Sequence, residues 1–444
     1  MNFNLALSNF RGFHNQDFVR VRPITILVGE NSAGKSSFLA GMKFILDFIS
    51  GRREASFNGD PFQLGTYDQI AHFRGGRGGR AKEFRISLRR NVIIRKSRHS
   101  DVSGSFQTDL HLFFEDVDSH ATVKKVVIAS SREELEISLE NERLKVTYTN
   151  NKGNRQTLND HSSEIPVARS ELLRYWQFAL HELRFRMRKE IEEKNNPVEA
   201  YGKSLAHLSE LADAITRRSP GVVEATSAIR TRPQRTYTPG TEQQDGEGSH
   251  VPYELAKLFR TKEQSAWRTV KSSIESFGKQ SDMFKELSVK AFGTTSSDPF
   301  QLQFSSDGPK TNLVDLGYGT SQVLPILYSI ATGTQGSFYL IQQPEVHLHP
   351  KAQAALGQYF VDSKINSGIN FVLETHSDFI VDRVRKSIAD GLIKNDDVSL
   401  LFFERERLEN KITQVELDKH GDPIEPPLSY RSFFIDEQMS MLGI

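Results

Sequence analysis

Apolar and polar residues near the N-terminus alternate in short runs that end in a β-branched stretch, Ile24-Thr25-Ile26-Leu27-Val28. A stretch of this kind is typical of a strand buried on both faces. After Gly29, apolar residues recur at helical spacing from Ser36 to Ile49. The pattern therefore predicts a strand, a glycine loop and a helix, in that order.

The middle of the chain changes its period twice. Residues 84–150 alternate at strand spacing between polar turns, which predicts an antiparallel sheet. Residues 171–193 and 197–215 instead repeat at helical spacing and predict a helical insertion. Residues 230–251 hold few apolar residues and many turn formers, so we expect a long loop there.

The C-terminal part predicts a second α/β pattern. Helical spacing resumes after Tyr253 and continues to about Leu287. Helices and strands then alternate, at 321–331 (helix), 338–341 (strand), 351–360 (helix) and 370–373 (strand). Such alternation favours a parallel sheet with helices on its faces.

Composition narrows the class of protein. A length of 444 residues is enough for two or three domains, and the absence of Cys excludes disulfide frameworks and thiol chemistry. With 57 Lys and Arg against 56 Asp and Glu, the net charge of +1 gives no global attraction to nucleic acid or membrane. No stretch approaches the roughly 20 apolar residues of a membrane span, so we expect a soluble, cytoplasmic protein without a membrane partner.

The glycine loop has a phosphate-binding pattern. Gly29 to Ser36 reads GENSAGKS and satisfies G-x-x-x-x-G-K-[ST] between the predicted strand and helix. Glycines let backbone N–H groups converge on a phosphate at a helix N-terminus. Lys35 would place a charge on the β- and γ-phosphates, and Ser36 would offer Mg²⁺ a hydroxyl ligand.

Three later segments carry further polar groups. Leu316 to Gln322, LGYGTSQ, opens a helix with two glycines and hydroxyls. Phe338 to Pro350, FYLIQQPEVHLHP, is a buried strand with polar residues at its C-terminal end, where open α/β sheets bind ligands. Phe371 to Asp378, FVLETHSD, repeats that arrangement with a histidine.

With Asn9-Phe10-Arg11-Gly12-Phe13 and the GENSAGKSS loop, these segments make the chain resemble ABC-type ATPases of the RecF, SMC and OLD kind. The likeness is closest to stand-alone ATPase subunits of bacterial antiphage systems, such as PARIS, Septu and related retron ATPases. It covers residues 1 to about 80 and 310–380. It implies an α/β fold: an ABC-type ATPase head with an antiparallel β subdomain and a largely helical insertion. We expect an N-terminal lobe at 1–154, the insertion at 155–290 and a C-terminal lobe at 291–444.

The resemblance also implies roles for individual residues toward ATP and Mg²⁺. The phosphates and Mg²⁺ would be held by Gly29, Asn31, Gly34, Lys35, Ser36 and Ser37, with Arg11 close to the nucleotide. Gln63 would be the Q-loop glutamine, with Gln69 competing for that role. The signature motif would comprise Gly317, Gly319 and Ser321, the D-loop His347 to Lys351, and the switch histidine would be His376.

Two positions depart from the family pattern. The strand that normally ends in an acidic pair carries Gln342 and Gln343, and Gly317 stands where a serine is typical. An amide keeps the shape of the acid but loses the charge that stabilises Mg²⁺ at Gln342 or orients the attacking water. We expect ATP binding with slow hydrolysis. Glu345 takes over a catalytic role, or the protein is a binding switch, or an acid at Gln342 was replaced by design.

One phosphate loop and one distant signature segment form two half-sites, and a two-fold homodimer would complete both. The alternative is a higher homo-oligomer. The resemblance implies a sensor or scaffold of a defence system that controls a separate effector, a nuclease or a toxin. The alternatives are a RecF-like DNA repair ATPase and a structural nucleotide-binding protein. The Arg74–Arg98 region, with eight Arg and two Lys between His72 and His99, would bind DNA or RNA or protect a sheet edge.

Two histidine-containing segments have other interpretations. Glu345, His347 and His349 alternate at strand spacing and could offer zinc three ligands. His376 could be a histidine of the core with no contact to a ligand.

Overall fold

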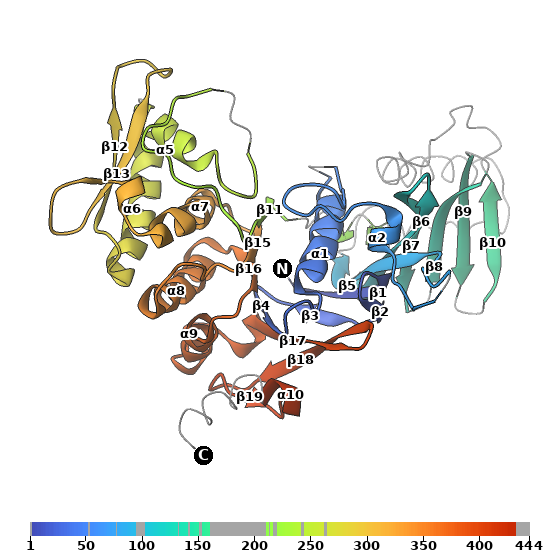
Figure 1. Cartoon of the computed structure of the whole chain (residues 1–444). Helices are drawn as coiled ribbons and strands as arrows, with labels where there is room; N and C mark the ends of the chain where they lie inside the picture. Colours follow the sequence, from blue (N-terminus) through green and yellow to red (C-terminus); the bar gives the residue numbers. More distant parts are fainter. Residues whose placement is uncertain are drawn as a thin grey trace.

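The computed structural model describes most of the chain (Figure 1). The described residues are 2–51, 54–76, 78–94, 103–131, 133–140, 143–150, 153–159, 210–212, 214–215, 220–240, 244–261 and 264–431. None of the helices in these ranges is long and apolar enough to cross a bilayer. Residues 160–209, which hold most of the two helices predicted at 171–193 and 197–215, lie outside the described residues.

The first sheet is antiparallel and comes from the N-terminal part of the chain. Its strands run in the order β10-β9-β8-β7-β6-β5-β1-β2, with β3 paired to β1. They are β1 (Phe3–Phe10), β2 (Phe13–Asn15), β3 (Val19–Val21), β5 (Phe84–Ile94), β6 (Gly104–Val117), β7 (His120–Ser130), β8 (Glu133–Glu140), β9 (Arg143–Asn150) and β10 (Arg155–Asn159). The antiparallel sheet predicted over residues 84–150 is thereby confirmed.

The second sheet joins the two ends of the chain. Its order is β11-β15-β16-β4-β17-β18-β19, and the strands from β11 to β17 are parallel. They are β11 (Val223–Thr226), β15 (Phe338–Gln342), β16 (Asn370–Glu374), β4 (Ile24–Gly29), β17 (Val398–Glu406), β18 (Glu409–Leu417) and β19 (Pro423–Ile424). The predicted α/β head, built from both termini, is confirmed because β4 lies between β16 and β17.

Both faces of the second sheet are covered, which explains the unbroken apolar run of β4. Leu27 packs into the core that contains helix α1 (Lys35–Ser50), while Ile26 and Val28 pack into the core of the opposite face. That opposite face carries α7 (Tyr318–Thr332), α8 (Pro350–Ser367) and α9 (Asp378–Ala389). The phosphate loop and the signature helix α7 therefore begin on different sides of one sheet.

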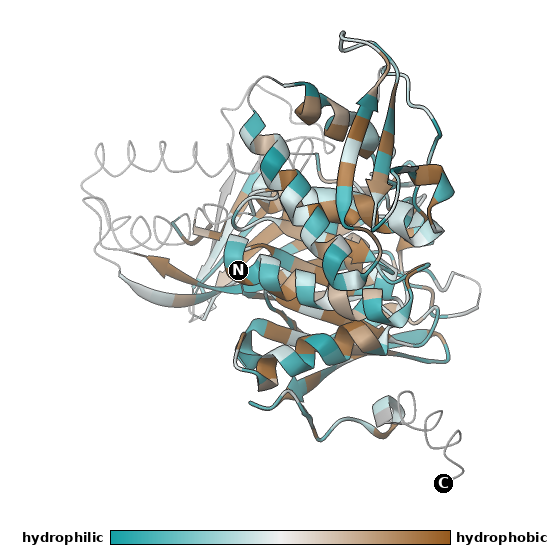
Figure 2. Cartoon of the chain, turned by 90° about the vertical axis from the view of Figure 1, so that its left-hand side faces the viewer, coloured by the Kyte–Doolittle hydropathy of each residue, from teal (hydrophilic) through white to brown (hydrophobic). Residues whose placement is uncertain are grey.

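Smaller elements complete the described residues. Helices α5 (Val251–Arg260) and α6 (Gln264–Ser281) pack outside α7 and α8 and are followed by a sheet of β12 (Glu286–Ala291), β13 (Phe300–Ser305) and β14 (Thr311–Asn312). Single turns are α2 (Tyr67–Ile70), η2 (Leu313–Asp315), η3 (Asn395–Asp397) and α10 (Leu428–Arg431). Figure 2 shows hydrophilic and hydrophobic positions alternating along the helices of this side. In α6 the buried positions Trp267, Val270, Ile274 and Phe277 recur at helical spacing, as expected for a helix with one face on the core.

The structure differs from the expected boundaries of the insertion. Strand β10, at the start of the range 155–290, extends the first sheet, and β11 pairs in parallel with β15 in the second. Both strands are short, so the sequence shows too few alternations to reveal them. Residues 227–250 have no helix or strand in their described part, as expected for the predicted loop.

Candidate nucleotide site

Four neighbouring parallel strands end at the same edge of the second sheet, and polar segments follow each of them. Arg230 comes after β11, Gln342 to Glu345 end and follow β15, Glu374 to His376 end and follow β16, and Gly29 to Ser36 follow β4. The C-terminal edge of an open parallel sheet is where such folds bind ligands. The structure thus brings the segments 29–36 and 374–376 to the same edge of the sheet.

The phosphate loop is shaped by left-handed backbone positions. Gly29, Ser32 and Gly34 have φ values of 127°, 63° and 96°, and α1 begins directly after Gly34. Lys35 is 3 % exposed, and its ammonium donates to the carbonyl oxygens of Gly29 at 2.9 Å and Glu30 at 2.7 Å. Because an ammonium has three N–H groups, one is left for a phosphate. Burial lowers the pKa of Lys35, while Glu374, Glu30 and Glu345 raise it.

The other predicted loop residues lie at or near the surface. Asn31 and Ser36 are exposed, and Ser37 is half-buried in the first turn of α1. Asn410, on β18, lies against the loop, and its amide occupies the space beside Gly12 and Gly34. The phosphate loop is therefore packed against the β17–β18 hairpin, which the sequence did not predict.

Gly34 tests this packing. A Cβ at Gly34 would lie 2.4 Å from Asn410 Nδ2 and 2.8 Å from Phe13 Cζ. Gly51, at the other end of α1, has a φ of 61° and open space around a Cβ. We expect Gly51→Ala to cost about 1–2 kcal/mol from the left-handed backbone alone, and Gly34→Ala to cost more because of the collision. Urea unfolding of both variants measures the difference, and equal losses would contradict the packing described here.

Glu374 is a carboxylate that contacts the first turn of the phosphate loop helix α1. Ser36 Oγ donates to its two oxygens at 3.0 and 2.9 Å, and Gln342 Nε2 lies 3.4 Å from Oε2. Gln342 and Glu374 are also paired in register across β15 and β16. Glu374 is 6 % exposed, and burial raises its pKa against the opposing effects of Ser36 and Lys35. Sequence reasoning did not select this residue, although an acid at the end of a buried run was a signal.

Glu345 ties the end of β15 to the switch segment. Its carboxylate accepts from Thr375 Oγ at 2.8 Å and from the backbone N–H of His376 at 2.7 Å. Burial raises the pKa of Glu345, and these two hydrogen bonds oppose the increase. Gln343 follows β15 with a left-handed φ of 41°, and its backbone N–H donates to the Glu374 carbonyl at 2.7 Å.

His376 lies at the predicted edge and is exposed. Partial burial and the charge of Lys35 lower its pKa, which favours the neutral imidazole. The alternative of a core histidine is therefore wrong. Ser377 caps α9 by accepting from the Ile380 N–H at 3.2 Å, and this cap fixes where the switch segment ends.

Arg230 is a buried cation beside the two amides. Its Nη2 donates to the carbonyl oxygens of Gln342 at 2.8 Å and Gln343 at 3.2 Å, and the side chain is 2 % exposed. Its Nε and Nη1 are buried without a hydrogen-bond partner. Burial lowers the pKa of Arg230 to about 10, and Glu345 opposes that effect. The sequence placed Arg230 only in a loop, because nothing local marks a side chain that folds back under a strand.

The predicted signature segment lies close to the predicted D-loop. Gly317 precedes α7, and Ser321 Oγ donates to the Tyr318 carbonyl at 2.7 Å. A Cβ on Gly319 would lie 2.5 Å from the His347 carbonyl oxygen, so α7 starts in close contact with the D-loop. Since α1 and α7 cover opposite faces of the sheet, one chain does not bring the two motifs together.

Arg11 and the two candidate Q-loop glutamines lie around α2. Arg11 Nη1 donates to the Gln69 carbonyl at 3.0 Å. The Gln69 side chain accepts from the Thr66 N–H at 2.9 Å in a capping box, whereas Gln63 is exposed. Gln69 is thus held in a helix cap, although both glutamines are exposed.

Most described arginines of the basic segment have partners inside the protein. Arg89 makes two hydrogen bonds to Asp109, at 2.8 and 2.7 Å, and Arg90 is 8 % exposed. Arg74 donates to Asn9 Oδ1 at 2.9 Å, and Arg80 to the Ala71 carbonyl at 3.0 Å. Residues 95–98, which belong to the same predicted patch, lie outside the described residues. Asp109 thus neutralises Arg89, whereas Arg74 and Arg80 are exposed and donate to uncharged acceptors.

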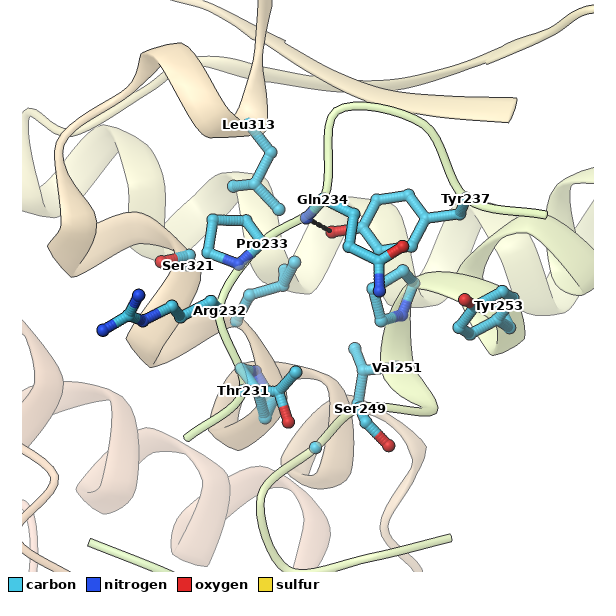
Figure 3. A pocket seen from close by; sticks show the side chains of 14 residues that line it. Thr231, Arg232, Pro233, Gln234, Tyr237, Ser249, Val251, Tyr253, Leu313 and Ser321 are labelled. Carbon is cyan, nitrogen blue, oxygen red and sulfur yellow. Dashed lines mark hydrogen bonds between the residues drawn. The ribbon is translucent and has the colours of Figure 1, made fainter. Parts of the chain in front are cut away.

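Two further features lie near the site. The described residues hold no group of three His, Cys, Asp or Glu arranged for a metal ion, so the zinc alternative has no support. A pocket of about 140 Å³ lies between the loop at 231–237, the start of α5 and α7 (Figure 3). Its walls include Arg232, Tyr237 and Ser321 but no phosphate loop residue, so it is separate from the nucleotide edge.

Residues 24–382 match the model of a family described as "AAA domain, putative AbiEii toxin, Type IV TA system". The chain belongs to this AAA domain family. The matched range begins with β4 and ends after the switch histidine, so it contains every motif of the edge. An AAA domain is an ATPase domain, which implies ATP and Mg²⁺ as ligands.

Solved structures similar to this AAA domain are SMC heads at low identity. An SMC head bound to the C-winged helix domain of ScpA has 11 % identity and a TM-score of 0.42, covering 94 % of this chain and 98 % of that one. A Pyrococcus furiosus Smc head with an extended coiled coil, bound to the C-terminal domain of ScpA, has 11 % identity, coverages of 100 % and 99 %, and a TM-score of 0.39. The SMC head domain from Thermotoga maritima has 11 % identity and a TM-score of 0.36, covering 93 % of this chain and 98 % of that one. No curated protein matches the chain.

The donor set at the edge fits a magnesium ion. Ser36 offers a hydroxyl and Glu374 a carboxylate in hydrogen-bond contact with it, and the amide Nε2 of Gln342 lies against the same carboxylate. Mg²⁺ binds through oxygen ligands of these types and retains waters. The residues present in this AAA domain are therefore chemically suited to the ion that its family implies.

Proposed function

We propose that this AAA domain binds magnesium–ATP at the edge of the second sheet and dimerises when it does so. One observation carries the proposal: Lys35 and Ser36 lie beside Glu374 and His376, while the signature segment starts on the other face of the sheet. Magnesium–ATP, when bound, supplies a polyanion with an electrophilic γ-phosphorus. Lys35 and the α1 N-terminus would bind its phosphates, and Arg11 and Gln63 would lie near the rest of the nucleotide.

The residues of this edge favour binding over rapid hydrolysis. Gln342 and Gln343 are neutral, so they orient groups through hydrogen bonds but do not attract a proton or a cation as an acid would. Glu345 holds the backbone of His376 in place, and the neutral imidazole of His376 can accept or donate one hydrogen bond at the γ-phosphate. We infer slow turnover, with dimer lifetime set by how long the nucleotide stays intact.

Gly317 gives the test of the dimer. A Cβ at Gly317 meets no atom within 4 Å, and its φ of −55° is allowed for any residue. We expect Gly317→Arg to leave the monomer folded and nucleotide binding intact while it blocks the partner's phosphate loop. Light scattering after gel filtration with a non-hydrolysable ATP analogue should show a dimer for the unsubstituted protein and a monomer for Gly317→Arg.

Gly317→Ser is the matched control for this test. It restores the hydroxyl that ABC-type signatures carry and should preserve or tighten the dimer. A dimer that forms equally in Gly317→Arg would show that the signature segment does not take part in association.

We propose further that the ATP-dependent dimer controls a separate effector protein, a toxin or nuclease, in a defence system against phage. The family description, which refers to a toxin and a type IV toxin–antitoxin system, supports a role of this class. Co-expression with the product of the neighbouring gene should give a complex whose stoichiometry changes with the ATP analogue. A Lys35→Ala chain should lose that change, and no complex in either nucleotide state would contradict the proposal.

A further inference from the structure

At the edge of the second sheet, an amide stands at the end of β15, where the family pattern has an acid, and an acid stands opposite it at the end of β16. Position Gln342, at the end of β15, carries an amide, and its register partner on β16 is the acid Glu374. Only one of the two facing residues is therefore charged. The two side chains touch, since Gln342 Nε2 lies 3.4 Å from Glu374 Oε2.

Glu345 and Glu374, two buried acids of this edge, differ in the groups that donate hydrogen bonds to them. Glu345 accepts one hydrogen bond on each oxygen, from the His376 N–H and the Thr375 hydroxyl, and these bonds belong to the framework of the switch segment. Glu374 instead accepts from Ser36 Oγ, the hydroxyl that a phosphate loop directs to a metal ion. Glu374 is thus the acid whose partner changes when a cation arrives.

We propose that Glu374 is the carboxylate of the metal–nucleotide site, so that the acid has moved from β15 to β16. This inference rests on the proposed function and assigns the residue that holds the divalent cation together with Ser36. On binding, the Ser36 hydroxyl turns its proton away from Glu374, and both oxygens face the cation. Gln342 then holds the carboxylate in place through its amide.

Distance supports the assignment. Neighbouring oxygen ligands of an octahedral Mg²⁺, each at about 2.0–2.1 Å from the ion, lie about 2.9 Å from each other. Ser36 Oγ and the Glu374 oxygens are 2.9 and 3.0 Å apart. The cation can therefore replace the hydrogen bond without movement of α1 relative to β16.

Repulsion between like charges explains why an amide stands at Gln342 opposite the acid Glu374. An acid at both Gln342 and Glu374 would place two carboxylates in contact at a buried edge, where like charges disfavour each other's ionised form. The amide at Gln342 removes that repulsion and leaves one negative charge for the cation. The same reasoning predicts that the acid can be moved back: Gln342→Glu should compensate for Glu374→Gln.

The experiment measures how much metal strengthens nucleotide binding. Calorimetry gives the dissociation constant of a non-hydrolysable ATP analogue with Mg²⁺ and with EDTA, and the ratio of the two is the metal enhancement. We expect Glu374→Gln to reduce this ratio at least about tenfold, as loss of metal-holding groups does elsewhere. The double variant Gln342→Glu/Glu374→Gln should regain most of the ratio. Paramagnetic resonance of Mn²⁺ with the analogue gives a second, direct readout of the ion.

Controls separate the possible failures. Glu416→Gln makes the same change on an exposed residue of β18 in the same sheet and should leave the ratio unchanged. Glu374→Asp keeps the charge on a side chain that is one carbon shorter, and we expect an intermediate metal enhancement. This variant keeps the test available if Glu374→Gln does not fold. An unchanged enhancement in Glu374→Gln, or no recovery in the double variant, overturns the inference. Absence of Lys35-dependent nucleotide binding in the unsubstituted protein would instead overturn the proposed function.

Discussion

Replacing Lys35 with alanine is expected to weaken magnesium–ATP binding about 100-fold or more. The Lys35 ammonium lies 2.9 and 2.7 Å from two loop carbonyls and Lys35 is 3 % exposed, so its third N–H would meet the phosphate as a largely buried charge. Removal of one partner of a buried charge pair costs about 2–5 kcal/mol in binding free energy, or about 30-fold to 5,000-fold in affinity, and the expected loss lies within this range. Calorimetric titration with the ATP analogue and Mg²⁺ measures it.

The fold should survive the Lys35→Ala substitution, because the lysine makes no salt bridge among the described residues and α1 is held by apolar contacts on the first core. Lys364→Ala, in the last turn of α8, is a control for the loss of one positive charge away from the edge. A thermal melt of each variant without nucleotide checks folding. Equal affinity in Lys35→Ala and the control would show that the glycine loop is an ordinary turn.

Much of the head could be predicted because its strands and helices have strong local patterns. The buried run at Ile24 to Val28 became β4, and helical spacing over 36–49 became α1. The helix expected at 321–331, the strand at 338–341 and the strand at 370–373 are confirmed as α7, β15 and β16. In each case the apolar residues keep one spacing over enough residues to distinguish a helix from a strand.

The sequence could not show contacts that depend on strand order. Glu374 becomes a partner of Ser36 only because β16 lies next to β4, and Arg230 reaches Gln342 only because β11 joins the sheet beside β15. The basic segment gives another example. Its arginines form a charged run in the sequence, but only the strand order shows that Asp109, on the neighbouring strand β6, neutralises Arg89.

The order of the strands also explains why the two amides are not equivalent. Gln342 faces Glu374 across β15 and β16, so a carboxylate there adds to an existing negative charge. Gln343 lies one residue beyond the strand, and Arg230 Nη2 donates to the backbone carbonyls of both Gln342 and Gln343, at 2.8 and 3.2 Å. We expect a new negative charge at Gln343 to be stabilised by this buried cation, whereas one at Gln342 is also opposed by Glu374.

Replacing Gln343 with glutamate is accordingly expected to raise the rate of phosphate release from ATP by about 10²–10³-fold, the usual effect of one electrostatic contributor. A carboxylate at this position accepts a proton from the attacking water and orients it, which an amide does poorly. Continuous phosphate assays at saturating magnesium–ATP measure the turnover. Gln342→Glu is the matched control, since it adds the same charge beside Glu374 and should give no comparable gain.

The expected gain in Gln343→Glu also depends on Arg230. If the guanidinium balances the introduced charge, Arg230→Met should cancel the gain in Gln343→Glu, while Arg230→Lys should preserve part of it. Turnover that stays low in Gln343→Glu, with nucleotide affinity and dimerisation intact, would mean that the missing acid does not limit hydrolysis and that Glu345 already fills the role. A gain of equal size in Gln342→Glu would contradict the different charge environments assigned to the two amides.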